Sequence, residues 1–316
     1  MFALVRAARV DYPSGGAGKK EKTEPSAAAA GPDAEGLLSL VFYMLSSAAE
    51  HKPFSKRKQL KPGAEFKTFA HYSRASYIIK DKWNCEPNCL LPETADTVLD
   101  YTWRSKSPAS AGYIGHNDST RVIVVVFRGT ADTDDWVQDS EFSLDPWPPQ
   151  IPGSMVHHGF LTAYQSVSGK VTKMVINLAR RYPDYKLVFT GHSLGGAETV
   201  MCAVDVLQQV PELKKRVHIY TYGMPRIGND AWADGIDKME LPVYRVVYEN
   251  DLVPHIPFQW LGYKHFAQEV WIHNNQTVFC GKDSESAQCS ASVAFADYSV
   301  PDHSRYTQAD WKFIIK

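Results

Sequence analysis

The sequence predicts one α/β domain built around a largely parallel β-sheet, and three observations support this prediction. Residues 122–127 form a continuous run of β-branched side chains that ends in a phenylalanine, as expected of a strand buried on both faces. Apolar residues between 161 and 178 recur at the spacing of a long amphipathic helix. From residue 61 onward, helical and strand patterns alternate, which is typical of a parallel sheet covered by helices.

Each predicted element follows from a local hydrophobic pattern. Apolar residues three and four positions apart indicate a helix face, and short β-branched runs indicate a buried strand. The long helix ends before Tyr182, which is followed by a proline that cannot continue it. In chain order the predicted elements are a first helix carrying Phe66, Phe69, Ala70, Ser73 and Tyr77, a strand at 122–127, a helix at 161–178, a strand at 186–190, a helix at 197–207, and strands at 217–222 and 243–248.

The composition argues against several classes of protein. The 316 residues suffice for a substantial core, and 34 basic against 35 acidic residues leave a net charge of −1. This balance does not favour a nucleic-acid partner or a polybasic membrane-surface protein. No apolar run is long enough to cross a bilayer, and no internal repeat is visible. We therefore expect a soluble, monomeric body with no transmembrane segment.

The five cysteines divide into two local pairs and one residue inside a predicted helix. Cys85 and Cys89 form one pair, and Cys280 and Cys289 form the other, each among loop residues. Two short disulfides and a structural thiol at Cys202 would indicate an oxidising compartment and hence a secreted protein. Reduced thiols in a cytosolic protein remain the alternative. No Cys/His quartet has spacing suited to zinc, so no metal site is predicted.

The first 60 residues do not resemble part of a catalytic domain. Residues 13–36 are rich in Gly, Ala, Pro and Lys, and this composition predicts disorder. The apolar run at 37–45 has the length of a signal-peptide core, although it begins far from Met1. We expect either a signal segment and pro-segment, ending at the basic residues 55–57, or an amphipathic packing helix. The predicted catalytic domain is then 61–316.

Residues 191–195, Gly-His-Ser-Leu-Gly, carry the strongest chemical signal. They stand between a predicted strand and a predicted helix, the setting in which a G-x-S-x-G turn lifts a serine nucleophile clear of a sheet. Neighbouring glycines avoid clashes in such a strained turn. The first helical N–H groups, starting with Leu194, then point at the space where an oxyanion would develop. We expect Ser193 to be a catalytic nucleophile.

A serine nucleophile needs a histidine base and a carboxylate that holds the histidine in the right tautomer. In α/β-hydrolases these follow the serine in the order acid, then histidine. Asp251 directly follows the predicted strand at 243–248, and carboxyl ends of strands are where such sheets place their sites. His303 lies in a late loop near the end of the chain. The other histidines after Ser193 come too early to leave a loop that returns to the site. We expect Asp251 and His303 to complete a triad.

Several motifs in order resemble the fungal class 3 lipases, from about Phe66 to the end of the chain. The segments that carry the resemblance are Phe127-Arg128-Gly129-Thr130, residues 156–160, the nucleophile turn at 190–197, the Gly-x-Pro-Arg loop at 222–229, the acid loop at 250–257, and Asp302-His303 with Tyr306. The resemblance implies an α/β-hydrolase fold, a central mostly parallel sheet flanked by helices. It also implies that Thr130 and Leu194 form the oxyanion hole and that no cofactor is needed. Cys280 and Cys289 align with a family disulfide, and Cys85 and Cys89 resemble another.

The segment after Thr130 departs from the family pattern. In typical members this segment is an amphipathic lid, but residues 131–142 contain more acidic than large apolar residues. Only Trp136, Val137 and Phe142 could contact lipid there. Because carboxylates oppose burial at an oil surface, we expect weak interfacial activation and partial glycerides or short-chain esters as substrates. In length and polarity the segment partly resembles the feruloyl esterases that share this fold.

The resulting prediction is a secreted lipase that cleaves acylglycerol esters through an acyl-enzyme on Ser193, acting on lipid at a lipid–water interface. A feruloyl or other aryl esterase on the same fold is the enzymatic alternative. A non-catalytic binding protein on a hydrolase scaffold is the alternative from a different class, although Ser193, Asp251, His303 and Thr130 are all present.

Overall fold

The structure is a computed structural model that describes residues 63–106, 109–130, 142–281 and 283–308. These residues belong to one compact unit that spans Phe54–Lys316. The expectations for residues 1–60, and for Trp136 and Val137 in the segment 131–141, lie outside the described residues. The expectation of a catalytic unit from residue 61 onward remains a proposal about where that unit begins.

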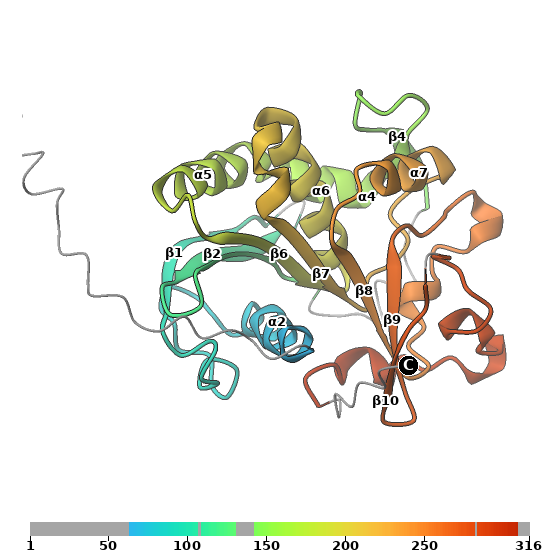
Figure 1. The fold of residues 1–316 in the computed structure, drawn as a ribbon. Helices are drawn as coiled ribbons and strands as arrows, with labels where there is room; N and C mark the ends of the chain where they lie inside the picture. The colour runs from blue at the N-terminus through green and yellow to red at the C-terminus, as the bar shows by residue number, and fades with distance from the viewer. Residues whose placement is uncertain (1–62, 107–108, 131–141, 282, 309–316) are drawn as a thin grey trace, which may run out of the picture. The chain divides into compact units, whose positions relative to one another are not determined.

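An eight-stranded sheet forms the centre of the described unit (Figure 1). Its strands run in the order β1-β2-β3-β6-β7-β8-β9-β10. The five central strands β3 to β9 are parallel to one another, whereas β1–β2–β3 and β9–β10 pair antiparallel. The predicted mostly parallel sheet is thereby confirmed. The strand bounds are Thr97–Arg104 (β1), Ala111–Asn117 (β2), Val122–Phe127 (β3), Lys186–His192 (β6), Val217–Tyr222 (β7), Val243–Tyr248 (β8), Gln268–His273 (β9) and Gln276–Phe279 (β10).

Helices cover both faces of the sheet. Helix α2 packs on one face, and α4, α5, α6 and α7 lie on the other (Figure 1). A two-stranded hairpin, β4 with β5, precedes α4. The bounds are Ala64–Ala75 (α2), Leu144–Pro146 (β4), Met155–His157 (β5), His158–Gln165 (α4), Ser168–Arg181 (α5), Leu194–Gln209 (α6) and Asp230–Lys238 (α7).

Strand β3 shows why the sheet needs both helical layers. All six of its side chains are buried. Ile123, Val125 and Phe127 belong to the apolar core under α4, α5 and α6. Their neighbours in the sequence, which point to the opposite face, belong to the core under α2. A strand without a polar face therefore marks the middle of the three layers, as its sequence predicted.

The predicted long helix at 161–178 is two helices in the structure. Helix α4 ends at Gln165, and α5 begins at Ser168. The Ser166 hydroxyl donates to the carbonyl oxygen of Ala163 at 2.7 Å, and the amide of Ser166 donates to Thr162, which closes the last turn of α4. The apolar stripes of the two helices together imitate one longer helix, because both helices pack on the same core.

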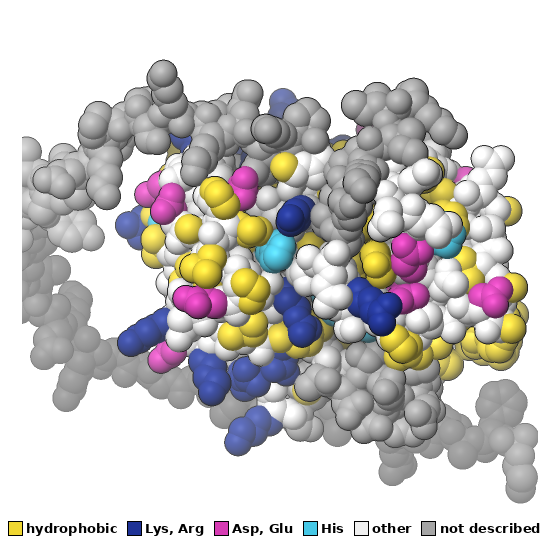
Figure 2. Space-filling view, turned by 90° about the horizontal axis from the view of Figure 1, so that it is seen from below, with side chains coloured by type: hydrophobic (Ala, Val, Ile, Leu, Met, Phe, Trp, Pro, Cys, Tyr) yellow, Lys and Arg dark blue, Asp and Glu magenta, His cyan; other side chains and the backbone are white. Residues whose placement is uncertain are grey.

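The surface carries charges of both signs. In the view from below, Lys and Arg side chains gather on the left and in the centre, whereas the right-hand side carries mainly uncharged and hydrophobic groups with scattered acidic ones (Figure 2). Among the described helices, none is both long and apolar enough to span a bilayer.

Candidate active site

The serine predicted as nucleophile sits in a strained turn between β6 and α6. Ser193 has φ 60° and ψ −136°, a left-handed conformation that side chains other than glycine rarely adopt. Two glycines make the turn possible: a Cβ at Gly191 would overlap the carbonyl oxygen of Gly195, and a Cβ at Gly195 would overlap that of Phe127. The Ser193 amide donates to the Tyr222 carbonyl at 2.9 Å, so neighbouring strand β7 fixes the turn.

The predicted acid and base meet in a buried hydrogen bond. Nδ1 of His303 lies 2.9 Å from Oδ2 of Asp251, and both side chains are buried. Asp251 follows β8, and His303 lies on the short helix η6, Pro301–Ser304. Gly223, with φ 60°, makes room for the pair, because a Cβ there would lie 2.7 Å from the imidazole and 2.9 Å from the carboxylate. Gly223, in the Gly-x-Pro-Arg loop, thus leaves the space in which the acid and the base form their hydrogen bond.

The serine and the histidine approach each other through adjacent backbone positions. Ser193 is bonded to the carbonyl of Tyr222, and the next residue, Gly223, touches the imidazole of His303. Oγ of Ser193 and Nε2 of His303 are both buried, and neither has a hydrogen-bond partner among the described residues. The two residues therefore lie beside the same short segment, Tyr222–Gly223, and the structure does not form the Oγ–Nε2 hydrogen bond. Such bonds are often loose before substrate binds.

The predicted oxyanion-hole residues adjoin the same serine. A Cβ on Gly129 would lie 2.8 Å from Cβ of Ser193, so the turn that carries Thr130 packs directly on the nucleophile. The Thr130 hydroxyl is buried and lacks a partner among the described residues. Leu194 is the first residue of α6, where backbone N–H groups have no partner within the helix. Both are placed where a negative oxygen could accept hydrogen bonds.

Tyr306 holds the acid in place. Its hydroxyl donates to Oδ2 of Asp251 at 2.6 Å, while the backbone amide of Val253 donates to Oδ1 at 2.9 Å. Burial and the neighbouring carboxylate raise the pKa of Tyr306 well above its usual value, so the hydroxyl stays protonated as a donor. The family resemblance included Tyr306 in the histidine loop but did not predict its contact with Asp251.

His192 supports the histidine loop from behind, a role that sequence reasoning missed. Its Nε2 lies 2.6 Å from the carbonyl oxygen of His303, and its Nδ1 lies 2.9 Å from the hydroxyl of Tyr77. Because a carbonyl only accepts, Nε2 carries the proton and Nδ1 accepts from Tyr77. Burial lowers the pKa of His192 well below its usual value, with a further contribution from His303, which keeps His192 neutral. Its position directly before the nucleophile was the available signal.

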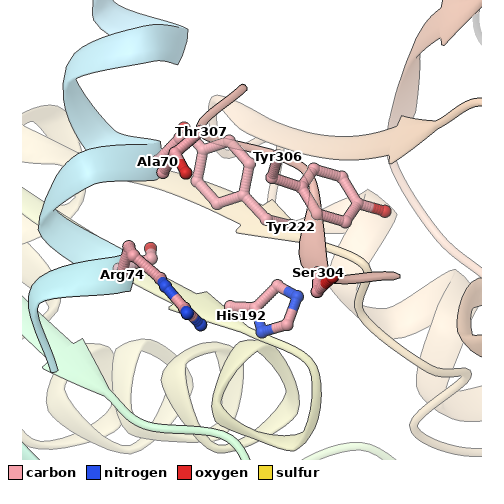
Figure 3. Close-up of a pocket in the computed structure, with 8 residues that line it drawn as sticks. Ala70, Arg74, His192, Tyr222, Ser304, Tyr306 and Thr307 are labelled. Atoms are coloured by element: carbon pink, nitrogen blue, oxygen red, sulfur yellow. The ribbon is translucent and has the colours of Figure 1, made fainter. Parts of the chain in front are cut away.

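A crevice lies behind the histidine loop, between that loop and α2 (Figure 3). His192, Arg74 and Tyr306 line it together with residues of α2 and of the chain after His303. Neither Ser193 nor Asp251 contributes to its lining. The crevice is thus separate from the nucleophile, and it belongs to the support of the histidine loop.

Phe142 is the only residue of the predicted lid contacts that the structure describes. It is half-buried, and its ring centroid lies 6.1 Å from that of His157. Its carbonyl oxygen accepts a hydrogen bond from the Tyr263 hydroxyl at 3.2 Å. Phe142 therefore packs against the body of the protein, and the expectation that it contacts lipid remains a prediction.

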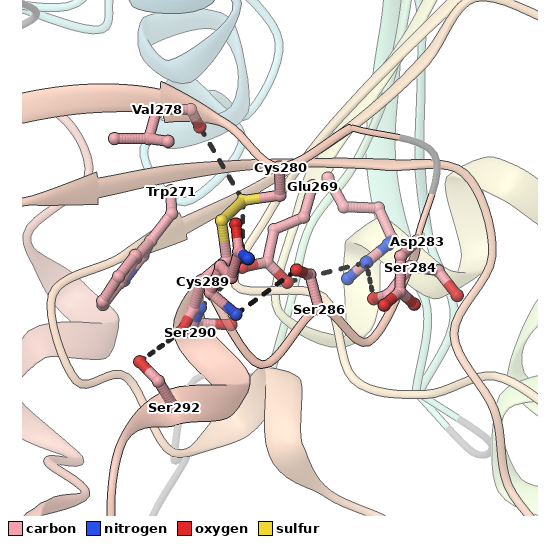
Figure 4. Close-up of a disulfide and its surroundings, with 12 residues drawn as sticks. Glu269, Trp271, Val278, Cys280, Asp283, Ser284, Ser286, Cys289, Ser290 and Ser292 are labelled. Carbon is pink, nitrogen blue, oxygen red and sulfur yellow. Dashed lines mark hydrogen bonds and ion pairs between the residues drawn. A yellow bond between two sulfur atoms is a disulfide. The ribbon is translucent and has the colours of Figure 1, made fainter.

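The predicted disulfide between Cys280 and Cys289 is present, with an S–S distance of 2.00 Å. It joins the end of β10 to the helix η4, Ser290–Ser292, beside Glu269 and Trp271 (Figure 4). The Glu269 carboxylate accepts from the amide of Ser290 at 3.0 Å. This bridge anchors the segment that leads into the histidine loop.

The predicted disulfide between Cys85 and Cys89 is not formed in the structure, where both residues are buried free thiols. The loop directs the backbone amide of Cys85 at the sulfur of Cys89, at 2.6 Å, and the amide of Asn88 at the carbonyl of Cys85. These two hydrogen bonds close the turn between Cys85 and Cys89 without a disulfide. Cys202 is a buried free thiol within α6, as the sequence predicted.

One buried acid near the site was not expected from the sequence. Glu198, on α6, is fully buried, and burial raises the pKa of its carboxyl group to about 8. The nearby hydroxyl of Ser110 and the charge of Arg128 oppose this shift without cancelling it. Arg128 immediately precedes the turn that carries Thr130, so the side chain whose charge acts on Glu198 is close in sequence to the predicted oxyanion hole.

Replacing Glu198 with Gln is expected to stabilise the protein increasingly as the pH rises from about 5 to about 8. The folded pKa lies above the usual value of 4.5, so the unfolded chain releases the proton first and stability falls across this interval. A neutral amide removes that loss, which is on the order of a few kcal/mol. Urea unfolding at pH 5 and pH 9 measures the free energy of unfolding of each variant, and Glu212→Gln, at an exposed position, is the control. If the free energy of unfolding changed with pH to the same extent in wild type and in Glu198→Gln, the prediction would be contradicted.

Comparisons with known proteins agree with this site. The profile of the class 3 lipase family matches residues 124–260. The chain is 36% identical over 228 residues to a lipase of Rhizomucor miehei, covering 71% of this chain and 61% of that protein. It is 30% identical over 226 residues to the secreted mono- and diacylglycerol lipase A of Penicillium cyclopium, covering 68% of this chain and 72% of that protein.

Solved structures give the same result. The crystal structure of a lipase from Rhizopus microsporus var. chinensis matches with a TM-score of 0.72 and 33% identity, over 78% of this chain and 87% of that one. A triacylglycerol lipase whose catalytic centre is a serine protease triad matches with a TM-score of 0.71 and 33% identity, over 79% of this chain and 94% of that one. The shared fold is the α/β-hydrolase fold that the resemblance implied.

Proposed function

Because this chain belongs to the class 3 lipase family, we propose that it is a serine carboxylic-ester hydrolase that cleaves acylglycerol esters. One observation carries the proposal: the buried His303–Asp251 hydrogen bond, 2.9 Å long, beside a strained Ser193. A buried imidazole that is oriented by a carboxylate and adjoins a serine is the arrangement that activates a hydroxyl for acyl transfer.

The proposed reaction proceeds through an acyl-enzyme. Ser193 Oγ attacks the ester carbonyl while Nε2 of His303 takes its proton, and Asp251 stabilises the imidazolium that forms. His303 then gives the proton to the departing alcohol. Water, activated by His303 in turn, attacks the acyl group and releases the fatty acid and free Ser193. These steps move only protons and an acyl group, so they require neither a metal nor a redox cofactor.

The negative oxygen of each tetrahedral intermediate is stabilised by Thr130 and Leu194. Their turns flank Ser193, and the amino end of α6 adds its positive dipole at the same point. Donors that are fixed before the reaction need no reorganisation when charge develops, so such a hole contributes strongly to the rate. Thr130 and Leu194 thus have oxyanion roles, and His192 and Tyr306 are positioning residues.

The proposed substrate class rests on the relatives. The proteins named above act as lipases, and one acts on mono- and diacylglycerols. The chain spans 61% of the length of the Rhizomucor lipase, so substrate and cellular location are transferred to it only as proposals. Secretion is supported by the Cys280–Cys289 disulfide and by the secreted relative from Penicillium.

A comparison of three esters tests the substrate. We expect the protein to hydrolyse tributyrin readily and olive oil more slowly, and to leave methyl ferulate essentially uncleaved. Initial rates at matched ester concentration, measured by titration of released acid, give the ranking. If methyl ferulate were hydrolysed fastest, the proposed function would be that of an aryl esterase and not of a lipase. Lack of hydrolysis of any of the three, together with no labelling of Ser193 by a fluorophosphonate, would overturn the enzymatic proposal.

A further inference from the structure

A cluster of four aromatic side chains, two of them exposed and two half-buried, lies next to the proposed site. It consists of Phe258, Trp260, Phe295 and Tyr298, which we call the aromatic rim. Trp260 is 78% exposed and Phe295 is 73% exposed, the two largest values among the exposed large apolar residues of the described chain. Phe258 joins them, because its ring lies 5.8 Å from Trp260 and 6.0 Å from Phe295. Tyr298 packs 6.0 Å from Phe295.

The aromatic rim is continuous with the loops that carry the acid and the base. Phe258 and Trp260 follow the acid loop, whereas Phe295 and Tyr298 precede His303. Two hydrogen bonds join these segments near Asp251. The side chain of Asn250 donates to the carbonyl of Asp297 at 3.1 Å, and the amide of Ser299 donates to the carbonyl of Asn250 at 2.8 Å. The rim therefore lies at the same edge of the sheet as the proposed triad.

The sequence around the rim is almost free of charge. Residues 252–263 contain no Asp, Glu, Lys or Arg, and residues 289–300 contain only Asp297. Exposed aromatic side chains in segments that carry a single charge favour an uncharged, partly apolar partner. Aromatic rings accumulate at lipid–water interfaces.

The backbone under the rim is held by a buried ion pair. Arg226 forms a two-bond pair with Glu285, at 2.8 and 2.9 Å. Its other nitrogen donates to the carbonyl oxygens of His255 and Pro257, directly before Phe258. The ring of His255 stacks on Tyr298 at 4.4 Å, which ties the second segment to the first. A surface fixed in this way loses little conformational freedom when it binds.

We propose that the aromatic rim is a fixed anchor that inserts Trp260 and Phe295 into an uncharged lipid surface and so presents the site to that surface. The inference rests on the proposed function, since acylglycerol substrates lie in such surfaces. The anchor belongs to the described body of the protein and does not depend on residues 131–141. It gives the enzyme a route to lipid even though that segment is acidic.

Vesicle sedimentation tests the anchor independently of catalysis. All variants carry Ser193→Ala, and each is mixed with phosphatidylcholine vesicles that also contain diacylglycerol. We expect Trp260→Ala with Phe295→Ala to lower the partition coefficient about tenfold or more, because two large aromatic surfaces stay in water. Leu90→Ala, which removes another apolar side chain, 61% exposed and remote from the rim in sequence, is expected to change it less than twofold. Equal binding of the rim variant and its parent, or no binding by the parent, would overturn the proposal.

Two further measurements separate the anchor from the proposed chemistry and from self-association. With Ser193 intact, the rim variant should hydrolyse dissolved p-nitrophenyl butyrate at the wild-type rate and lose activity only on vesicle-borne diacylglycerol. If wild type lacked esterase activity, the proposed function would fail while sedimentation still decided on the anchor. If the rim variant changed the sedimentation velocity of the protein without lipid, the rim would be a contact between two copies, and the lipid anchor would be wrong.

Discussion

Replacing Ser193 with Ala is expected to lower the rate of ester hydrolysis roughly 10⁴-fold or more while leaving the fold intact. The hydroxyl oxygen is the atom of the proposed site that forms a covalent bond to substrate, so its loss removes the acyl-enzyme route. The fold should tolerate the change, because Oγ has no hydrogen-bond partner among the described residues and its removal therefore breaks no hydrogen bond there. The expected result is a folded, nearly inactive protein.

Hydrolysis of p-nitrophenyl butyrate measures this effect, and urea unfolding checks the fold. Ser168→Ala is the matched control: it makes the same substitution on α5, where the hydroxyl donates to the Gln165 carbonyl at 3.4 Å and to no other group among the described residues. Activity of Ser193→Ala within about tenfold of wild type would remove Ser193 as nucleophile. A misfolded Ser193→Ala protein would instead show that the hydroxyl is structural, and that result also contradicts the prediction.

Replacing Asp251 with Asn is expected to lower kcat/KM by roughly 10⁴-fold, by analogy with the loss known for the same change in serine protease triads. Asp251 accepts hydrogen bonds from Nδ1 of His303, the hydroxyl of Tyr306 and the amide of Val253. An amide NH₂ facing Nδ1 would force the proton of the imidazole onto Nε2, which then cannot accept a proton from Ser193. The loss should appear in kcat, because the substituted group does not touch substrate.

Asp302→Asn is the control for this change, because the neighbouring carboxylate binds Arg305 and the amide of Asn250 but not the imidazole. It should retain activity close to that of wild type. Tyr306→Phe removes one of the three donors to Asp251 and should cost less than Asp251→Asn, with an altered pH profile of kcat. A larger loss for Asp302→Asn than for Asp251→Asn would mean that the acid had been assigned to the wrong residue.

The sequence predicted most of what depends on local patterns. The buried strand β3, the helices α2 and α6, and the strands β6, β7 and β8 all follow from short periodic runs, and each occurs near its predicted place. The strands β1 and β2 at one edge of the sheet and β9 and β10 at the other were not predicted, because their side chains mix polar and apolar residues. The predicted long helix failed at Ser166, where a side chain bonds to the preceding turn.

Contacts between distant segments were beyond sequence reasoning. Nothing local at Tyr306 or His192 shows that one donates to Asp251 and the other to the carbonyl of His303. The two cysteine pairs make the same point, since both pairs are near neighbours in the chain and only Cys280–Cys289 is bonded. The raised pKa of Glu198 depends on burial by the layers around α6.

By itself, the sequence predicted the chemistry and determined the order of its proposed parts: a glycine-flanked serine after one strand, an aspartate after a later strand, and a histidine near the end. Only the tertiary structure decided that these parts adjoin, that Gly223 leaves room for the acid–base pair, and that Trp260 and Phe295 form one exposed surface. The physical reason is that the periodic patterns of helices and strands depend on residues that are close together in the sequence. Proximity across 50 or 100 residues instead follows from how the strands are ordered in the sheet and how the layers bury their apolar faces.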